Sequence, residues 1–421
     1  MELLSPAGSV EKLRIAYRYG ADAAYIGIGG FSLRSTADSV FVRDAPDDGG
    51  GTPVDHAARI AELEQLKRLD GRPRKLYGAL NLFAHEHDLR ELPRILETLR
   101  AYPLDALILA DIGLIEPIRR VMPDIDLHLS TQANCTNSAA ARLYHRLGFS
   151  RIVAARELSL DDIRSIRDAV PDLEVEVFVH GAMCMSYSGR CFLSTMMTGR
   201  SANRGDCAHS CRWNYAITEE KRPGEYYPIE EDRRFSTILS SRDLMLYDYL
   251  DELHDAGVTA VKIEGRMKSA LYAAVTTGAY RFRIDAVDPA RDHQWRRLLH
   301  ALSHREYTAG FLFNDETVHR PADGASPAGY RLMGILRDRR GERRIVEAKN
   351  AIHRTASVQV LTVAGELHRI ENPLLFDVEG NPVERIVQGT PGTIEVPPDI
   401  ASCPLDDAIL IAPGAPRTTR R

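Results

Sequence analysis

Cysteine is scarce in this chain, with six among 421 residues, and long apolar runs are absent. No stretch approaches the roughly 18 consecutive apolar residues that a membrane-spanning helix needs. The opening MELLSPAGSVEK has neither the basic start nor the apolar core of a secretory signal. Disulfide-stapled proteins are usually short, secreted and rich in cysteine. These absences argue against that class and predict a cytoplasmic protein without membrane contact.

An excess of positive charge is also missing, because the formal net charge is -5. Such a chain has no general attraction for nucleic acid, so binding one would require a local basic surface. Two segments are candidates for that surface. RDRRGERR at 337–344 has five arginines against two acids, and the segment 184–213 has four arginines against one acid. A solvated charged face is the simpler interpretation of each segment.

Short apolar runs, often β-branched, recur along the first 265 residues with amphipathic segments between most of them. Runs that are apolar on both faces indicate parallel strands covered by helices. Eight such runs in about 280 residues predict an α/β fold, a (β/α)8 TIM-like barrel. No GxGxxG follows the first run, which disfavours a dinucleotide-binding sheet. The runs begin at Glu2, Ala23, Lys75, Ala106, Asp126, Arg151, Glu174 and Thr259.

The pattern changes after the predicted barrel, which is expected to span 1–285. Residues 286–327 mix helical and polar stretches and are expected to connect two domains. Short β-like runs separated by turn residues predict a small all-β domain, a β-barrel or sandwich, over 328–412. The last residues, 413–421, are expected to be disordered.

Polar residues stand at the ends of the predicted strands. The active site of a TIM-like barrel lies at the carboxyl ends of its strands, so these residues are candidates for binding and catalysis. Strand-end caps and ion pairs are the alternative interpretation, and a buried histidine bonded to a backbone carbonyl is the alternative for the histidine. The candidates are Asn81, Asp111, Gln132, Asn134, Arg156, His180, Glu264, Arg266 and Lys268.

Four of the six cysteines fall within 28 residues directly after the seventh run: Cys184, Cys191, Cys207 and Cys211. Four thiolates from one loop can hold an iron–sulfur cluster. Structural zinc prefers cysteine pairs two to four residues apart, which only Cys207 and Cys211 satisfy. Unrelated free thiols are the third possibility. The remaining two, Cys135 and Cys403, are expected to be small buried hydrophobes.

The run EVFVHGAMCMSYSGRCFLS resembles the signature of the collagenase-like peptidase family U-32. Further similar segments, among them MELLSPAG, HLSTQANCTN, SSRDL and VKIEGRMKS, extend this resemblance over the whole predicted barrel. The chain is most similar to the branch of that family that makes 5-hydroxyuridine at the wobble position of tRNA, with prephenate and without oxygen. Related branches hydroxylate ribosomal RNA or ubiquinone precursors.

The resemblance implies a 4Fe-4S cluster on the four clustered cysteines, with the tRNA anticodon loop, prephenate and an electron donor as partners. It also implies roles for the strand-end residues. His180 and Glu264 become candidate catalytic groups, and Arg34, Arg156 and Arg266 become candidates for gripping the carboxylates of prephenate. The other ligand-binding candidates are Asn81, Asp111, Gln132, Asn134 and Lys268.

Peptidase activity is the alternative function, since relatives are described that way. A serine or cysteine protease needs a nucleophile beside a base, and a common metalloprotease needs HExxH. Neither is visible, because the sequence HEH at 85–87 lacks the spacing of two helical ligands. The segment at 216–221 is also shorter than in the tRNA-hydroxylating branch, so any partner contact made there is an open question.

Overall fold

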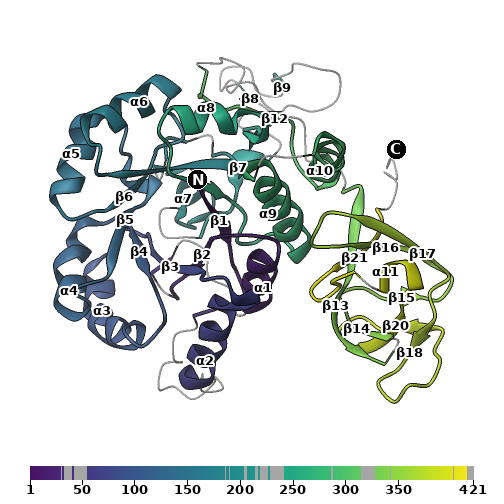
Figure 1. The fold of residues 1–421 in the computed structure, drawn as a ribbon. Helices are drawn as coiled ribbons and strands as arrows, with labels where there is room; N and C mark the ends of the chain where they lie inside the picture. Colours follow the sequence, from purple (N-terminus) through teal and green to yellow (C-terminus); the bar gives the residue numbers. More distant parts are fainter. Residues whose placement is uncertain are drawn as a thin grey trace. The chain divides into compact units, whose positions relative to one another are not determined.

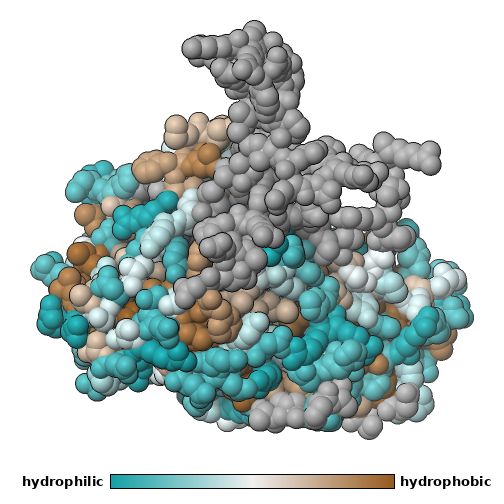
Figure 2. Space-filling model, turned by 90° about the horizontal axis from the view of Figure 1, so that it is seen from above, coloured by the Kyte–Doolittle hydropathy of each residue, from teal (hydrophilic) through white to brown (hydrophobic). Residues whose placement is uncertain are grey.

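The computed structural model describes most of the chain (Figure 1). Hydrophilic side chains cover much of the face shown in Figure 2, with smaller hydrophobic areas between them. No described helix is long and apolar enough to cross a membrane. The described residues are 1–29, 31–32, 40–41, 55–184, 186–188, 190–202, 206–213, 217–218, 226–227, 241–285, 288–313, 328–341, 343–401 and 403–414.

Eight parallel strands form a closed barrel, as the sequence predicts. Each strand pairs in parallel with the next one, and β11 closes the ring by pairing with both β1 and β7. Residues in these strands are buried almost throughout, which explains the continuous apolar runs. The strands are β1 (Glu2–Pro6), β2 (Ala23–Gly27), β3 (Lys75–Leu80), β4 (Ala106–Leu109), β5 (Asp126–Leu129), β6 (Arg151–Val153), β7 (Glu174–Ala182) and β11 (Ala260–Ile263).

Some of the helices between the strands begin at well-formed caps. Ser159 and Asp162 form a capping box at the start of α6, and the Asn137 side chain accepts from the backbone of Ala140 at the start of α5. The helices are α1 (Val10–Arg18), α2 (His56–Lys67), α3 (Glu86–Leu99), α4 (Ile115–Val121), α5 (Ser138–Arg146), α6 (Leu160–Ala169), α7 (Leu193–Thr198), α8 (Leu250–Asp255) and α9 (Ala270–Ile284).

Strand β7 is longer than its neighbours, and its extra length is secured by another strand. The short strand β10 (Asp243–Met245) pairs antiparallel with the end of β7, and β12 (Tyr307–Thr308) pairs with β10. Arg305 binds Asp243 through two guanidinium nitrogens, at 3.0 and 2.5 Å. Residues 184–213, which contain the four clustered cysteines, are called the cysteine segment. This segment follows β7, which ends at Ala182, and it therefore starts from a fixed strand end.

The C-terminal region is antiparallel and all-β, as expected. Seven strands form one sheet in the order β17-β16-β21-β13-β14-β20-β18, and every neighbouring pair is antiparallel. Its strands are β13 (Tyr330–Arg340), β14 (Arg343–Ala348), β16 (Ser357–Leu361), β17 (Leu367–Glu371), β18 (Leu375–Phe376), β20 (Pro391–Glu395) and β21 (Ile409–Pro413), beside the pair β15 (Ile352–His353) and β19 (Arg385–Ile386).

The chain forms two compact units whose segments interleave along the sequence. The first contains 1–13, 22–267 and 305–325, and the second contains 14–21, 268–304 and 326–421. The second unit thus combines the C-terminal sheet with α9, α10 (Pro289–Ala301), α11 (Pro398–Ala401) and part of α1. The domain boundaries at 285 and 327, and disorder of the tail, stay predictions.

Candidate active site at the barrel mouth

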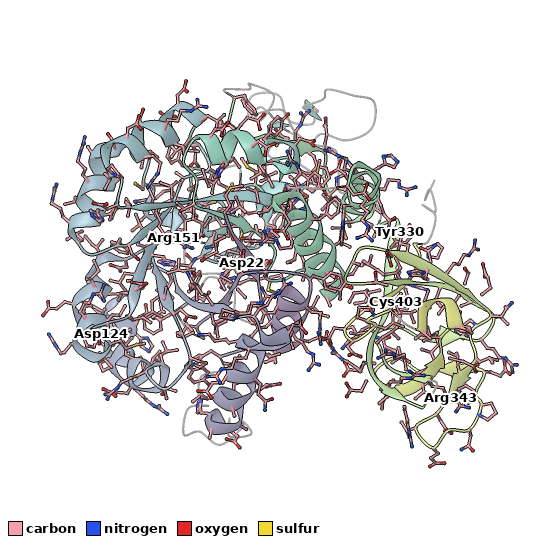
Figure 3. The ribbon with its side chains drawn as sticks, in the orientation of Figure 1. Asp22, Asp124, Arg151, Tyr330, Arg343 and Cys403 are labelled. Atoms are coloured by element: carbon pink, nitrogen blue, oxygen red, sulfur yellow. The ribbon has the colours of Figure 1, made fainter. Side chains whose placement is uncertain are left out.

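A network of buried charges fills the barrel interior. Glu176 on β7 accepts from Lys262 Nζ at 2.8 Å and from Arg151 Nη1 at 3.1 Å. Arg151, which lies inside the barrel (Figure 3), also binds Glu2 on β1 at 2.6 Å. Burial lowers the pKa of Lys262, and Glu176 opposes that shift. Paired charges in a low-dielectric interior fix the side chains that carry them. The network therefore forms a rigid support for the carboxyl ends of the strands, which we call the barrel mouth.

Two aromatic rings lie next to that network. The ammonium group of Lys262 is 4.6 Å from the ring centre of Tyr25 and 5.5 Å from that of Phe178. The Tyr25 hydroxyl donates to the Ile263 carbonyl at 2.9 Å, at the last residue of β11. Cation–π contacts of this kind hold aromatic rings in place. The rings therefore connect the charged interior to the residues that follow the strands.

Two arginines and one acid meet at the carboxyl ends of β2, β6 and β11. The Arg156 guanidinium lies 4.1 Å from the ring centre of Phe178 and 3.9 Å from Glu264. Arg266 is 6% exposed and donates to the Ser32 hydroxyl at 2.6 Å. Its guanidinium lies 5.5 Å from the ring centre of Tyr25. With two cations and one anion, this group has a net positive charge and suits an anionic ligand.

His180 is the buried histidine of β7 that the sequence singles out. Its backbone carbonyl accepts from the Glu264 amide at 2.8 Å, which joins the ends of β7 and β11. Its ring packs at 54° against Tyr307, with centroids 5.5 Å apart. The structure thus places the backbones of both candidate catalytic residues side by side.

Two amide side chains after β5 have buried oxygens with no partner among the described residues. Gln132 is 7% exposed, and its Oε1 accepts no hydrogen bond there. Asn134 Oδ1 is in the same condition, and Asn134 has a left-handed backbone, with φ 56°. Buried polar atoms are nearly always satisfied in folded proteins. Unpartnered oxygens at the carboxyl end of a barrel strand are therefore suited to receive donors from a ligand.

The other predicted binding residues have different surroundings. Asp111 accepts from the amides of Gly113 at 2.9 Å and Ala84 at 3.0 Å, which makes it a loop-organising cap. Asn81 follows β3 directly and is partly buried. Lys268 belongs to the second compact unit, with its ammonium 5.5 Å from the Tyr272 ring centre. Arg34 and the segment 219–221 lie outside the described residues.

The four clustered cysteines are free thiols. Cys184 is exposed, and Cys191, Cys207 and Cys211 are partly exposed. Among the described residues, no three of these four sulfurs lie within 4.8 Å of one another. One tetrahedral zinc ion would hold thiolate sulfurs about 3.8 Å apart, from a Zn–S bond of about 2.3 Å. A 4Fe-4S cluster binds each thiolate to a different iron and so needs wider spacing.

Hydrogen bonds fasten the cysteine segment to the end of β6. Glu157 accepts from Ser188 through the backbone amide at 2.7 Å and the hydroxyl at 2.9 Å. The Arg156 amide donates to the Ser188 hydroxyl at 3.5 Å. Further along, the His209 amide donates to Cys207 Sγ at 3.3 Å. Ser188 thus links the cysteine segment to the strand end that bears Arg156.

The cysteine segment also presents apolar side chains to solvent. Met196 is 83% exposed, which is unusual for a residue of its type. Arg190 stacks on Phe83, 5.5 Å from its ring centre, and Arg200 pairs with Asp206 at 2.7 Å. Arginines beside exposed rings are typical of surfaces that bind unpaired nucleotides. The other exposed apolar residues are Tyr187, Phe192, Met197 and Trp213.

Sequence reasoning missed several residues that shape the mouth. Three of these residues lie inside apolar runs, where nothing in the sequence marks them as members of a charged network: Tyr25, Phe178 and Lys262. Their positions alternate with buried aliphatic residues, which is a signal of inward-facing strand positions. Ser32 and Ser188 are isolated serines in loops, and only the folded chain shows their partners.

Comparison with known proteins places this architecture in a family. The model of Peptidase family U32 matches residues 54–320. The chain is 33% identical over 412 residues to tRNA hydroxylation protein P of Escherichia coli, covering 87% of each chain. It is 38% identical over 287 residues to the 23S rRNA 5-hydroxycytidine C2501 synthase of that organism, covering 68% of this chain and 40% of the synthase. It is 29% identical over 343 residues to a collagenase of Porphyromonas gingivalis, covering 77% of each chain. The chain therefore belongs to peptidase family U32.

Proposed function

We propose that this protein hydroxylates the wobble uridine of tRNA to 5-hydroxyuridine, in the cytoplasm and without oxygen gas. The observation that carries this proposal is the attachment of a four-cysteine segment to the strand end that bears Arg156. The match to a tRNA hydroxylation protein over 87% of each chain supports the same substrate class. The rRNA synthase matches over a smaller share of its own length, which favours tRNA over ribosomal RNA.

The cysteine segment has the donor set that a 4Fe-4S cluster requires. Cys184, Cys191, Cys207 and Cys211 form no disulfide and are at least partly exposed, so four thiols of one segment are available to a cluster. When bound, such a cluster supplies one-electron transfer. The His209 amide that donates to Cys207 Sγ would stabilise that sulfur as a thiolate.

The mouth arginines would bind prephenate, which has two carboxylates. Arg266 is held by Ser32 and Tyr25, and Arg156 is held by Phe178. Guanidinium groups that are fixed in advance lose less entropy when they grip a carboxylate in a bidentate manner. Glu264, near Arg156, would repel a misplaced carboxylate and so restrict how the dianion can enter.

The target base must leave its stack before its ring can react, and anticodon loops present such bases. The exposed rings and arginines of the cysteine segment would stack on the flanking nucleotides and contact their phosphates. Gln132 Oε1 and Asn134 Oδ1 are unsatisfied acceptors in the described structure and would accept from the uracil N3–H or from prephenate.

Replacing C5–H by C5–OH adds one oxygen atom and removes two electrons from the base, so the reaction needs either an oxygen donor that is itself reduced by two electrons or water together with a two-electron acceptor. The C5 proton must also leave. Glu264 and His180 lie at the joined ends of β11 and β7, where a carboxylate or an imidazole can accept that proton.

Cysteine replacement tests the proposal. Changing Cys191 to Ser should remove iron and abolish 5-hydroxyuridine in tRNA from a complemented deletion strain. Cys135→Ser is the matched control, because Cys135 is fully buried and burial raises the pKa of its thiol to about 11. Wild-type iron and nucleoside levels in Cys191→Ser would contradict the proposal. If the Cys191→Ser strain instead lost 5-hydroxycytidine from ribosomal RNA and kept 5-hydroxyuridine in tRNA, the substrate would be ribosomal RNA and not tRNA.

A further inference from the structure

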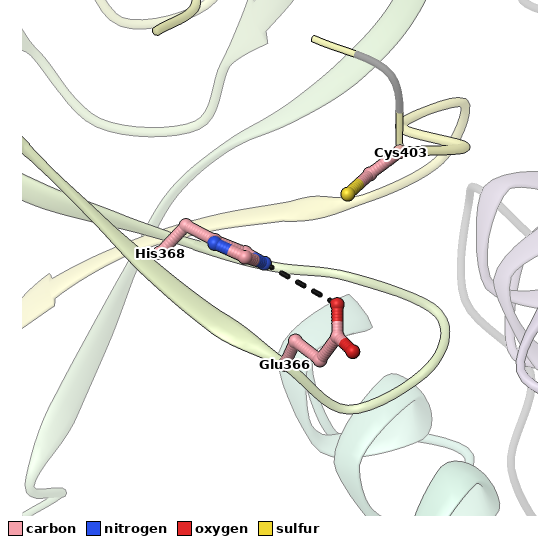
Figure 4. Close-up of side chains that lie close together, drawn as sticks. All are labelled: Glu366, His368 and Cys403. Carbon is pink, nitrogen blue, oxygen red and sulfur yellow. Dashed lines mark hydrogen bonds and ion pairs between the residues drawn. The ribbon is translucent and has the colours of Figure 1, made fainter. Parts of the chain in front are cut away.

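We propose that Glu366, His368 and Cys403 form a second metal site, specific for zinc or a similar divalent ion, in the C-terminal β region. Their donor atoms all lie within 4.8 Å of one another. Figure 4 shows the Cys403 sulfur and the Glu366 carboxylate both directed toward the His368 ring. This site is independent of the cysteine segment and of the proposed function.

The His368 ring and the Glu366 carboxylate are joined by a long hydrogen bond whose length also suits two ligands of a tetrahedral ion. His368 Nε2 lies 3.4 Å from Glu366 Oε2, whereas an N–H···O hydrogen bond usually measures about 2.7 to 3.2 Å. Ligands at about 2.0 to 2.1 Å from a tetrahedral zinc ion are separated by about 3.3 to 3.4 Å. Nitrogen and oxygen therefore already stand at the distance of two ligands of one ion.

The backbone places two of the donors at the start of an edge strand. His368 lies on β17, which pairs only with β16 in the described sheet, and Glu366 directly precedes the first residue of that strand. Side chains two residues apart point to the same face of a strand. The tight turn before β17 is closed by Thr362, whose amide donates to the Glu366 carbonyl at 2.9 Å and whose hydroxyl accepts from the Glu366 amide at 3.1 Å.

Helix α10 orients the carboxylate without occupying both of its oxygens. Arg291 donates to Glu366 Oε1 at 3.0 Å, while Oε2 faces His368. Gln294, on the same helix, donates to the Gly365 carbonyl in the turn. Outer-shell hydrogen bonds of this kind commonly fix metal-binding carboxylates. The helix thus presents one carboxylate oxygen to the proposed ion.

Cys403 determines which ion the site would select. Cys403 is partly exposed at the edge of the C-terminal core, so the expectation from the sequence that it is a buried hydrophobe is wrong. A thiolate together with an imidazole favours zinc or cobalt over magnesium or calcium. Three protein ligands leave the fourth position to water. Binding would link β17 to the segment after α11, and ligands that bind only the folded state stabilise it.

Cobalt titration of the metal-free, full-length protein tests the site. A Co²⁺ ion bound by a thiolate gives a near-ultraviolet charge-transfer band, so the band reports Cys403 directly. We expect Cys403→Ser and His368→Gln each to bind one equivalent less than the unmodified chain, with a smaller band. The buried Cys135→Ser variant is the matched control and should behave as the unmodified chain.

The cysteine segment can also bind cobalt, so a second protein isolates the site. With Cys184, Cys191, Cys207 and Cys211 all changed to Ser, the chain should still bind one Co²⁺ with a thiolate band, and further change of Cys403 should abolish it. Equal stoichiometry and equal spectra in the unmodified chain and in Cys403→Ser would overturn the proposal, whatever the result for tRNA.

Discussion

Replacing Arg266 by lysine should weaken prephenate binding about 10- to 150-fold. Arg266 is buried, and one of its nitrogens is committed to Ser32 at 2.6 Å. A lysine keeps the positive charge, but a single ammonium cannot hold Ser32 and grip a carboxylate in a bidentate manner. The loss of one charge-assisted hydrogen bond costs about 1.5 to 3 kcal/mol, and each 1.4 kcal/mol is about tenfold in affinity.

Calorimetric titration of prephenate into anaerobically prepared, cluster-loaded protein gives the dissociation constant. Arg164→Lys is the matched control, because Arg164 is an exposed arginine of α6 that pairs with Asp161. Iron content and the thermal midpoint should be near the unmodified values in both variants. A shifted midpoint in Arg266→Lys would mean that the lost affinity reflects altered packing around Tyr25.

Equal prephenate affinity in Arg266→Lys and in the unmodified protein would refute the reasoning. The dianion would then bind without the Arg266 fork, and Arg156 would be the remaining candidate among the described residues. The Arg156 guanidinium lies against Phe178 and near Glu264. Glu264 would therefore compete with the bound carboxylate for Arg156. Removing the Glu264 charge would then strengthen binding.

Two further predictions concern the stability of the fold and the anchoring of the cysteine segment. Asp407 is fully buried and accepts from Arg14 at 3.0 Å. Asp407→Asn should therefore lower the free energy of unfolding, measured by chemical denaturation, by about 3 kcal/mol. The control is Asp406→Asn, at a carboxylate 48% exposed, which should change that free energy by less than about 1 kcal/mol. Burial alone would raise the pKa of Asp407, but its arginine partners hold that pKa below the ordinary value of 3.8. The stabilisation by Asp407 is therefore complete above pH 3.8 and is lost as the pH falls through the lowered pKa. Equal acid sensitivity of the two variants would contradict this pH dependence. Glu157→Ala should free the cysteine segment, because it removes both carboxylate oxygens that accept from Ser188. Faster hydrogen exchange over 184–213 would show this, and unchanged exchange would refute that role.

The barrel was predictable because each strand leaves a local signal. A parallel strand buried on both faces must be apolar along its length, and runs such as AAYIG in β2 follow this rule. Closure of the ring follows once eight such runs alternate with helices. The antiparallel C-terminal sheet was predictable for a similar reason, since its turns carry glycine and polar residues between short β-branched runs.

The details of the mouth were not predictable, because they depend on partners far apart in sequence. Glu2, Arg151 and Glu176 meet inside the barrel although up to 174 positions separate them. Asp111 ends a strand run just as Gln132 follows one, yet Asp111 caps a turn while the Gln132 oxygen has no partner among the described residues. A sequence pattern identifies strand ends, but only packing decides which polar groups are already satisfied.

The two serines that hold residues at the barrel mouth, Ser32 and Ser188, are not arranged as the nucleophile of a serine protease. A serine nucleophile needs a base that removes its proton, and Ser32 instead accepts a hydrogen bond from Arg266, a cation that cannot serve as that base. The buried Ser188 hydroxyl does donate to a carboxylate, but the same Glu157 also receives the Ser188 amide, which is the arrangement of a loop anchor. The two serines fix Arg266 and the cysteine segment in place. The contacts of Ser188 therefore attach the cysteine segment to the strand end that bears Arg156, which is the attachment that the proposed hydroxylation depends on.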